Sequence, residues 1–285
     1  NNMSRHKIHY EVFNGHNPTA ETERHWEVEV HASPEELQVF AESGYMVRES
    51  LFQNEALQQL QDALDELEQA EWEKRGKAVS PHSQLKKQGW GLILRHLMDK
   101  HEVFLELLKF QPLLSIARAM MGPLVRLRGL SARISYPGDG RRHQTPWHQH
   151  LKVISNPLPP WFSRPHCIDC LIYLDDLNQD TGEIAVVPES HNWLDQASPG
   201  TYEPIEDEVV ISIKAGGVIL IHGNLWHRAL PTLHAKRRML ILSYTPTWLR
   251  KSRAAGPQPR DGLTEIFLED ADFEEQMLLG IGGYS

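Results

Sequence analysis

The sequence predicts a mainly β protein, a sandwich or barrel of short strands that follows a group of helices along the chain. After residue 125, short β-type runs alternate with turn residues, whereas amphipathic helical patterns dominate before that point. Many short strands at this spacing are typical of sandwiches and barrels. With 285 residues and 40% apolar content, the chain is expected to form one domain with a substantial core.

The first part of the chain, residues 1–124, is predicted to be mostly helical. Ser33-Pro34-Glu35-Glu36 combines an N-cap, a proline in the first turn and a glutamate that closes a capping box, so a short helix begins there. Further patterns predict a brief strand over residues 44–47, a long amphipathic helix over 51–72, and helices over 99–110 and 113–121.

The second part, residues 125–250, is predicted to carry the strands, and residues 251–285 are expected to form a C-terminal tail of the same domain. Turn residues such as Asp180-Thr181-Gly182 and Ala215-Gly216-Gly217 separate the β-type runs. The predicted strands span residues 126–136, 146–154, 168–174, 184–187, 208–213, 218–222 and 239–244.

Charge and composition exclude several classes of function. A formal net charge of −9 argues against a nucleic-acid-binding protein, because phosphate neutralisation requires a clustered basic surface. No run approaches the roughly 20 apolar residues of a membrane span, and the polar first residues lack the apolar core of a signal peptide. Two cysteines fit a reducing compartment, so the expected location is the cytoplasm. Nothing in the sequence indicates an oligomeric state.

Two histidines in the stretch T-P-W-H-Q-H are the first candidates for chemistry. His148 and His150 stand at i and i+2 of the strand predicted over 146–154, so both would point to one face. Imidazole is the commonest metal ligand, and His227, just after a predicted strand, is the candidate third ligand. The chain has sixteen histidines, so spacing alone leaves open an ordinary pair of strand histidines bonded to backbone carbonyls.

The pair Cys167 and Cys170 has the C-x-x-C spacing of redox and zinc sites. The pair enters a predicted strand, where residues three apart face opposite sides. We therefore predict no metal or redox role for it.

Four segments resemble the phytanoyl-CoA dioxygenase family and occur in the family's order. They are W-H-Q-H at 147–150, C-L-I-Y-L-D-D-L-N-Q-D-T-G-E-I-A-V-V-P-E-S-H-N-W at 170–193, A-G-G-V-I-L-I-H-G-N-L-W-H-R-A-L-P at 215–231 and R-R-M-L-I-L-S-Y-T-P-T-W at 237–248. The resemblance, over roughly residues 33–250, implies a double-stranded β-helix, a cupin-like jelly roll with helices packed outside. It also implies an iron(II)- and 2-oxoglutarate-dependent dioxygenase that uses molecular oxygen.

The resemblance assigns His148 and His227 as the first and last metal ligands. The family holds the far carboxylate of 2-oxoglutarate with an arginine eleven residues after the last ligand, which is Arg238 here; Arg237 would face away in a strand. His150 stands where the family has an aspartate, so a metal held by all three histidines would lack an anionic protein ligand.

Other residues near these motifs are weaker candidates. Strand parity suggests Arg133 and Gln144 as further cosubstrate-binding residues, and Trp147 and Trp226 flank ligands as candidates for substrate binding. Two glutamates stand where the family has small or rigid residues, and each is either an ordinary surface carboxylate or a source of the charge that is lost at position 150; they are Glu183 and Glu189.

Three functions fit these motifs. We favour a 2-oxoglutarate-dependent oxygenase that hydroxylates a small molecule at an atypical three-histidine site. One alternative is a three-histidine dioxygenase whose substrate chelates the metal without 2-oxoglutarate, and another is an inactive homologue that only binds a small molecule. Three nitrogen ligands would shift metal preference toward zinc, nickel or copper. It also stays open whether His150 binds the metal or turns away and leaves a free position.

Overall fold

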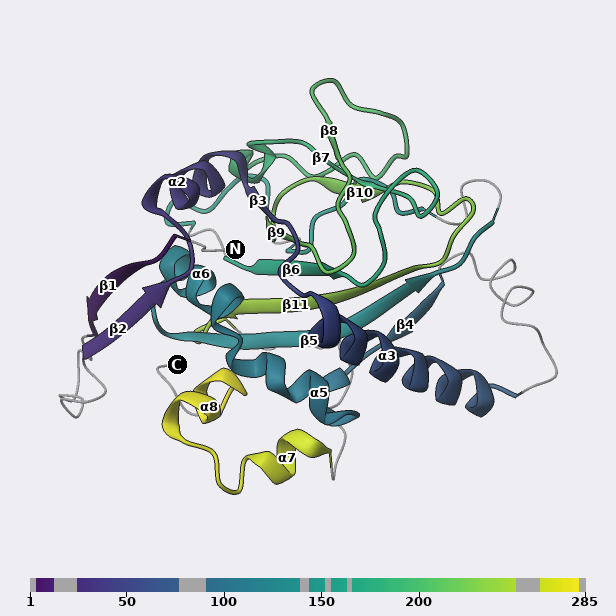
Figure 1. Cartoon of the computed structure of the whole chain (residues 1–285). Helices are drawn as coiled ribbons and strands as arrows, with labels where there is room; N and C mark the ends of the chain where they lie inside the picture. Colours follow the sequence, from purple (N-terminus) through teal and green to yellow (C-terminus); the bar gives the residue numbers. More distant parts are fainter. Residues whose placement is uncertain are drawn as a thin grey trace.

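Two antiparallel sheets form the centre of the protein, as the computed structural model in Figure 1 shows. The structure describes residues 4–12, 25–76, 91–138, 144–151, 155–162, 166–249 and 262–281. The larger sheet has the order β3 (Tyr45–Arg48), β9 (Val218–His222), β6 (Ile168–Tyr173), β11 (Arg237–Pro246), β5 (Val125–Ser135) and β4 (Leu92–Leu94). The smaller sheet has the order β10 (His227–Ala229), β7 (Ile184–Val186) and β8 (Val209–Ile211).

The large sheet is covered on both faces. All six residues of β6 are buried, which is typical of a central strand packed on two sides. Successive side chains alternate between the faces: Cys170 and Ile172 join the apolar core under the helices, whereas Leu171 and Tyr173 join a second core against the small sheet. We call the face that carries Leu171 and Tyr173 the inner face.

The second core lies between the two sheets. It joins large-sheet residues such as Ile219 and Met239 to Ile184, Val186 and Ile211 of the small sheet. Two facing antiparallel sheets with helices outside form the predicted jelly roll.

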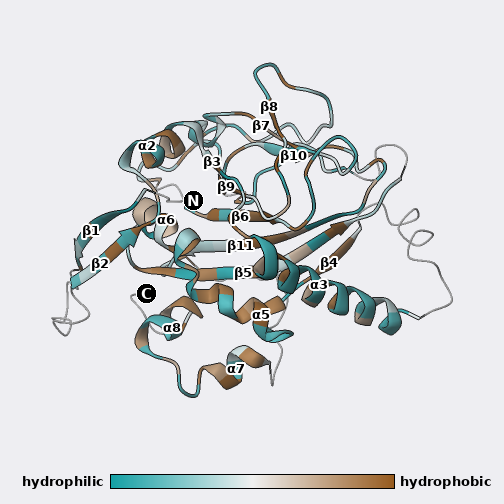
Figure 2. Ribbon diagram, in the orientation of Figure 1, coloured by the Kyte–Doolittle hydropathy of each residue, from teal (hydrophilic) through white to brown (hydrophobic). Residues whose placement is uncertain are grey.

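Helices cover the other face of the large sheet, and Figure 1 shows most of them on the side away from β7, β8 and β10. The α-helices are α2 (Pro34–Ser43), α3 (Asn54–Lys74), α5 (Glu102–Leu105), α6 (Gln111–Met121), α7 (Leu263–Phe267) and α8 (Phe273–Leu278), with 3₁₀ turns η1 (Leu97–Asp99), η2 (Glu106–Lys109) and η4 (Ser190–Asn192). Hydrophobic residues lie along β5 and β6, while α3 is largely hydrophilic (Figure 2). Within the described part of the chain, no helix combines the length and apolar character that a membrane crossing requires.

The predicted capping box at the start of α2 is confirmed. The Ser33 hydroxyl accepts a hydrogen bond from the Glu36 backbone N–H at 3.2 Å, and the Glu36 carboxylate accepts one from the Ser33 N–H at 2.7 Å. Gly44 ends the helix with φ of 85°, a left-handed conformation that glycine adopts at little cost.

The strand predicted over residues 146–154 is wrong for the described residues 144–151. This segment forms only an isolated bridge between His148 and His227. Two of its other backbone N–H groups bond to loops: Trp147 N–H donates to Thr201 O at 2.9 Å, and His150 N–H donates to Gly223 O at 2.8 Å. Residues 152–154 lie outside the described part of the chain.

Other elements differ from the prediction in number or length. The helix predicted over 99–110 is divided into η1, α5 and η2, and the front part also carries the hairpin of β1 (His6–Glu11) and β2 (His25–Val30) as well as β3 and β4. The C-terminal tail contains α7 and α8, and the buried Met277 and Leu278 hold α8 against the rest of the protein. These elements are short, and most lack the repeated apolar spacing that identifies a long helix.

Removing a large side chain from the core under the helices should destabilise the protein. Leu240 on β11 is fully buried in that core, so Leu240→Ala is expected to lower the free energy of unfolding by about 2 to 5 kcal/mol in urea titrations. Leu233→Ala is the matched control, since Leu233 is 42% exposed, and its effect should stay near or below about 1 kcal/mol. Equal losses for the two variants would contradict the packing described above.

Candidate metal centre

Three histidines from two separate segments meet beside the small sheet. His148 and His227 exchange backbone hydrogen bonds of 3.0 and 3.1 Å, so the segment before His150 is attached to the start of β10. His150 is attached in turn to Gly223, in the connection between β9 and β10. A Cβ at position 223 would lie 2.8 Å from Cys167 Cβ, closer than such atoms approach, so glycine is required at this contact.

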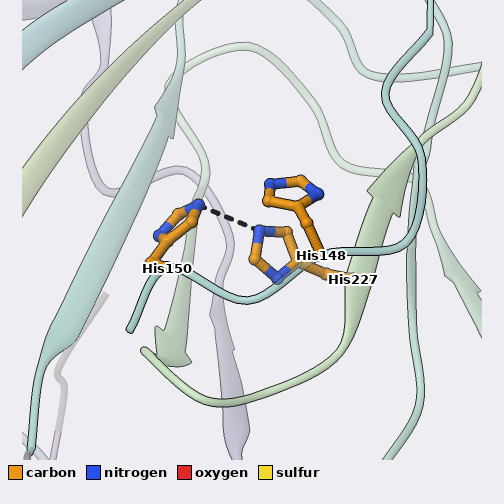
Figure 3. A group of neighbouring side chains, drawn as sticks. All are labelled: His148, His150 and His227. Atoms are coloured by element: carbon orange, nitrogen blue, oxygen red, sulfur yellow. Dashed lines mark hydrogen bonds between the residues drawn. The ribbon is translucent and has the colours of Figure 1, made fainter. Parts of the chain in front are cut away.

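The three imidazole rings converge, as Figure 3 shows. Their candidate ligand atoms all lie within 4.8 Å of one another, and His227 Nε2 is 3.0 Å from His150 Nε2. The ring centroid of His148 lies 4.2 Å from that of His227 and 5.4 Å from that of His150. Two metal-bound nitrogens about 2.1 Å from one ion at a right angle lie about 3 Å apart, so the Nε2 separation suits a shared metal.

The second nitrogen of each ring explains why the Nε2 atoms are available. His148 Nδ1 bonds to Pro146 O at 2.8 Å and His227 Nδ1 bonds to Leu225 O at 2.9 Å. Since a carbonyl oxygen only accepts, each Nδ1 must carry the proton, and a neutral ring then has a lone pair at Nε2. His150 Nδ1 makes the corresponding bond to a carboxylate, Asp169 Oδ2, at 2.7 Å.

The chemistry of this donor set fits a metal ion. Two Nε2 lone pairs 3.0 Å apart repel each other unless a proton or a cation lies between them. Burial, together with the nearby His148 and His150 rings, holds the pKa of His227 well below its ordinary value, so this ring stays neutral as a ligand must. Imidazole rings whose Nδ1 atoms each bond to a protein acceptor are the arrangement expected of metal-binding histidines.

Asp169 was not predicted as a site residue, and it is the only residue of β6 with a charged side chain. It is fully buried on the inner face, where its Oδ1 accepts a hydrogen bond from Ser243 of β11 and lies 3.8 Å from Arg128 Nη1. Burial opposes ionisation, but attraction and hydrogen bonding by His150, with help from Arg128, hold the pKa of Asp169 below its ordinary value. An aspartate inside the otherwise apolar run C-I-D-C-L-I-Y was the sequence signal that could have identified it.

The prediction that Arg238 faces the site and Arg237 faces away is wrong. Arg238 lies on the outer face, where Asp175 and Asp65 pair with its guanidinium at 2.7 and 2.9 Å. Arg237 shares the inner face with Met239 and is buried.

The Arg237 guanidinium has neutral partners. It donates to Gly182 O and to Ser135 Oγ, and no described carboxylate forms an ion pair with it. Arg133 lies on the same face of β5, and burial together with the positive charge of Arg237 lowers the pKa of Arg133. Gln144 precedes Thr145, whose N–H donates to Ala229 O of β10, and the described contacts include none from Gln144 to the histidines or to Arg237.

The two tryptophans predicted to bind substrate lie instead in a separate apolar cluster with Ala185 and Val187. Trp147 is 1% exposed, donates its indole N–H to Glu203 O at 2.8 Å and lies under the Arg228 guanidinium. Trp226 packs edge to face on Trp193. Their cluster includes Ala185 of β7, so both tryptophans pack against the small sheet.

The remaining candidates are the two cysteines and the two glutamates, of which Glu183 is buried and Glu189 is exposed. Cys167 and Cys170 are free, buried thiols. The alternation of faces along β6 places Cys170 in the apolar core under the helices. The Glu183 carboxylate accepts a hydrogen bond from Ser212, and Glu189 precedes the short turn η4. The carboxylate that contacts His150 is that of Asp169, which lies on β6, the strand that also carries Cys170.

Solved structures with the same architecture include HygX from Streptomyces hygroscopicus with nickel and 2-oxoglutarate bound, at 16% identity and a TM-score of 0.58 over 78% of this chain and 90% of that chain. The 2-oxoglutarate-dependent carbocyclase SnoK from nogalamycin biosynthesis matches at 17% identity and a TM-score of 0.55, over 81% of this chain and 93% of that chain. The 2-oxoglutarate-dependent epimerase SnoN from the same biosynthesis matches at 15% identity and a TM-score of 0.55, over 75% of this chain and 82% of that chain. At these identities the likeness shows the fold.

The sequence profile described as phytanoyl-CoA dioxygenase (PhyH) matches residues 40–240. The matched region contains the three histidines, both arginines of β11, the whole small sheet and all of the large sheet except the end of β11. Because the match covers well over half of the chain, the protein belongs to the phytanoyl-CoA dioxygenase (PhyH) family of non-haem iron, 2-oxoglutarate-dependent enzymes.

Proposed function

We propose that the protein is an oxygenase that hydroxylates a small molecule, with iron(II) held by His148, His150 and His227. The observation that supports this most directly is the convergence of the three rings: one candidate ligand nitrogen of each lies within 4.8 Å of the others, and each Nδ1 has its own acceptor. Iron(II), when bound there, supplies the redox chemistry that couples conversion of 2-oxoglutarate and oxygen into succinate and carbon dioxide to oxidation of the substrate.

Arg237 is the proposed partner of the far carboxylate of 2-oxoglutarate. Its guanidinium is buried on the inner face, and its described partners are a backbone carbonyl and a hydroxyl. A bidentate pair with a carboxylate matches guanidinium geometry and compensates the buried positive charge. Arg133, on the neighbouring strand, adds positive charge at the same end of the inner face. Binding of 2-oxoglutarate by HygX in the same fold supports this assignment.

We further propose that the chain acts as one oxygenase domain, with the helices of residues 1–124 and the tail of residues 251–285 packed around the strands of 125–250. Contacts between distant elements support this, since α6 packs on β2 and β11, and α8 packs on β5. Two free cysteines fit the reducing conditions of the cytoplasm, which we propose as its location.

Anaerobic addition of iron(II) and then 2-oxoglutarate to the metal-free protein tests the proposed site. We expect iron to bind and the visible charge-transfer band of chelated 2-oxoglutarate to appear. Iron binding without the band would replace this proposal with a dioxygenase whose substrate chelates the metal. Absence of iron binding would replace it with a small-molecule-binding protein without redox chemistry.

The two arginines of β11 should separate cosubstrate binding from fold stability. Arg237→Ala is expected to weaken 2-oxoglutarate binding by about 2 to 5 kcal/mol, roughly 30-fold to several-thousand-fold, because it removes a buried charge partner. Arg238→Ala is the matched control: it should leave the dissociation constant of 2-oxoglutarate unchanged and lower the unfolding temperature, because Asp175 loses its partner. Titrations followed by the charge-transfer band and thermal unfolding measure both effects, and the reverse pattern would contradict the assignment.

Acid should destabilise the metal-free protein through His227. The pKa of His227 is held well below its ordinary value near 6.5, whereas in the unfolded chain it returns to that value. Below about pH 6.5 the unfolded state therefore binds more protons, so the free energy of unfolding falls as pH decreases, by up to about 1.4 kcal/mol per pH unit for this one group.

Urea titrations between pH 7.5 and 5 measure this slope. His227→Gln should flatten it, whereas His234→Gln, at a side chain that is 73% exposed, should leave it unchanged. An identical slope in His227→Gln and the unmodified protein would show that His227 titrates normally.

A further inference from the structure

We propose that Asp169 supplies negative charge to the metal centre through His150, in place of a carboxylate that binds the metal directly. The inference rests on the proposed function, because it concerns how the three-histidine site holds its metal. It assigns Asp169 as a positioning residue, not as a ligand.

The contact between Asp169 and His150 is direct and fully enclosed. Asp169 is 0% exposed, and its Oδ2 accepts the hydrogen bond from His150 Nδ1 at 2.7 Å. The other carboxylate oxygen accepts from Ser243, the residue opposite Asp169 in the pairing of β6 with β11. Cys167 Sγ also donates to Oδ2, at 3.5 Å, so both carboxylate oxygens are held by neighbours and the position of the carboxylate determines which way the His150 ring faces.

The described Nδ1 contacts of the other two histidines are to neutral groups. His148 and His227 donate from Nδ1 to the neutral carbonyls of Pro146 and Leu225, each two residues earlier in the chain. His150, which replaces the family's aspartate ligand, is the one of the three whose Nδ1 bonds to an anion. The negative charge that the family places on the metal ligand itself is thus carried by Asp169, one imidazole ring farther from the metal and behind the same ligand position.

This arrangement changes the imidazole as a donor. A carboxylate that accepts from Nδ1 fixes the tautomer and makes Nε2 more basic, so the metal receives more electron density than from a ring bonded to a carbonyl. Among the described residues, the side chains grouped closely enough to share a metal are the three histidines, and Asp169 is not one of them. Asp169 therefore acts through the His150 ring.

Metal affinity in a double-mutant cycle tests the inference. Asp169→Asn keeps the side-chain shape and an acceptor for Nδ1 but removes the charge, and it should weaken iron(II) or cobalt(II) binding about 10- to 100-fold in anaerobic competition with a chelator. In the His150→Asp background the carboxylate is the ligand itself, so Asp169→Asn should cause no loss there and should relieve repulsion between the two carboxylates. Asp195→Asn, at an exposed position, controls for the change in net charge.

A spectroscopic signature separates charge donation from a packing role. With iron and 2-oxoglutarate bound, a less electron-rich metal should move the charge-transfer band of Asp169→Asn to shorter wavelength, and Asp195→Asn should leave the band in place. Ser243→Ala keeps the carboxylate but removes one of its supports, so it should weaken metal binding less than Asp169→Asn does. It serves as the test if thermal unfolding shows that Asp169→Asn is not folded.

Three results would overturn the inference while leaving the proposed function intact. The first is full metal affinity in Asp169→Asn, or in Ser243→Ala if that variant must replace it. The second is an equal loss for Asp169→Asn in the unmodified and His150→Asp backgrounds, which would indicate a purely structural role. The third is full affinity in His150→Ala, which would make Asp169 the ligand itself. An unmodified protein that binds no metal removes the proposed function and the inference together.

Discussion

The hydrogen bonds that the three imidazole Nδ1 atoms make orient the rings of the candidate metal centre. Without them the rings could turn, and either nitrogen could carry the proton. Two of the bonds are local, because His148 and His227 each use a carbonyl two residues earlier in their own segment. The third joins His150 to Asp169 on the central strand of the large sheet. Two ligands are therefore oriented by their own loops, and the third is oriented by the core of the fold.

The pairing of β6 with β11 connects the two ends of the proposed site. At one end of the pair, Ser243 lies opposite Asp169 and supports the carboxylate behind His150. At the other end of β11, Arg237 reaches Gly182 just before β7, on the inner face. One strand thus carries both a support for the metal ligand and the proposed partner of 2-oxoglutarate, and β-sheet pairing holds the two at a constant separation.

The jelly roll and the three histidines could be predicted from the sequence, whereas the choice between Arg237 and Arg238 could not. The grouped histidines followed from motifs, but which arginine lies on the inner face depended on which face each residue of β11 occupies. In R-R-M-L-I-L-S-Y the apolar residues do not alternate with polar ones, because both faces of this strand are buried. Which face of the sheet each residue of β11 occupies is then decided by its pairing with the neighbouring strands. Asp169 was missed for a related reason, since its role depends on a contact 19 positions away in the sequence.

The burial of Arg237 has a consequence for how the protein behaves without its cosubstrate. A guanidinium that is 4% exposed, with no described carboxylate beside it, makes the empty state electrostatically unfavourable. A dianion that pairs with Arg237, as proposed for 2-oxoglutarate, would relieve that cost and so would bind the folded chain in preference to the unfolded one. The concentration of 2-oxoglutarate in the cell would then influence how long the protein survives as well as how fast it works.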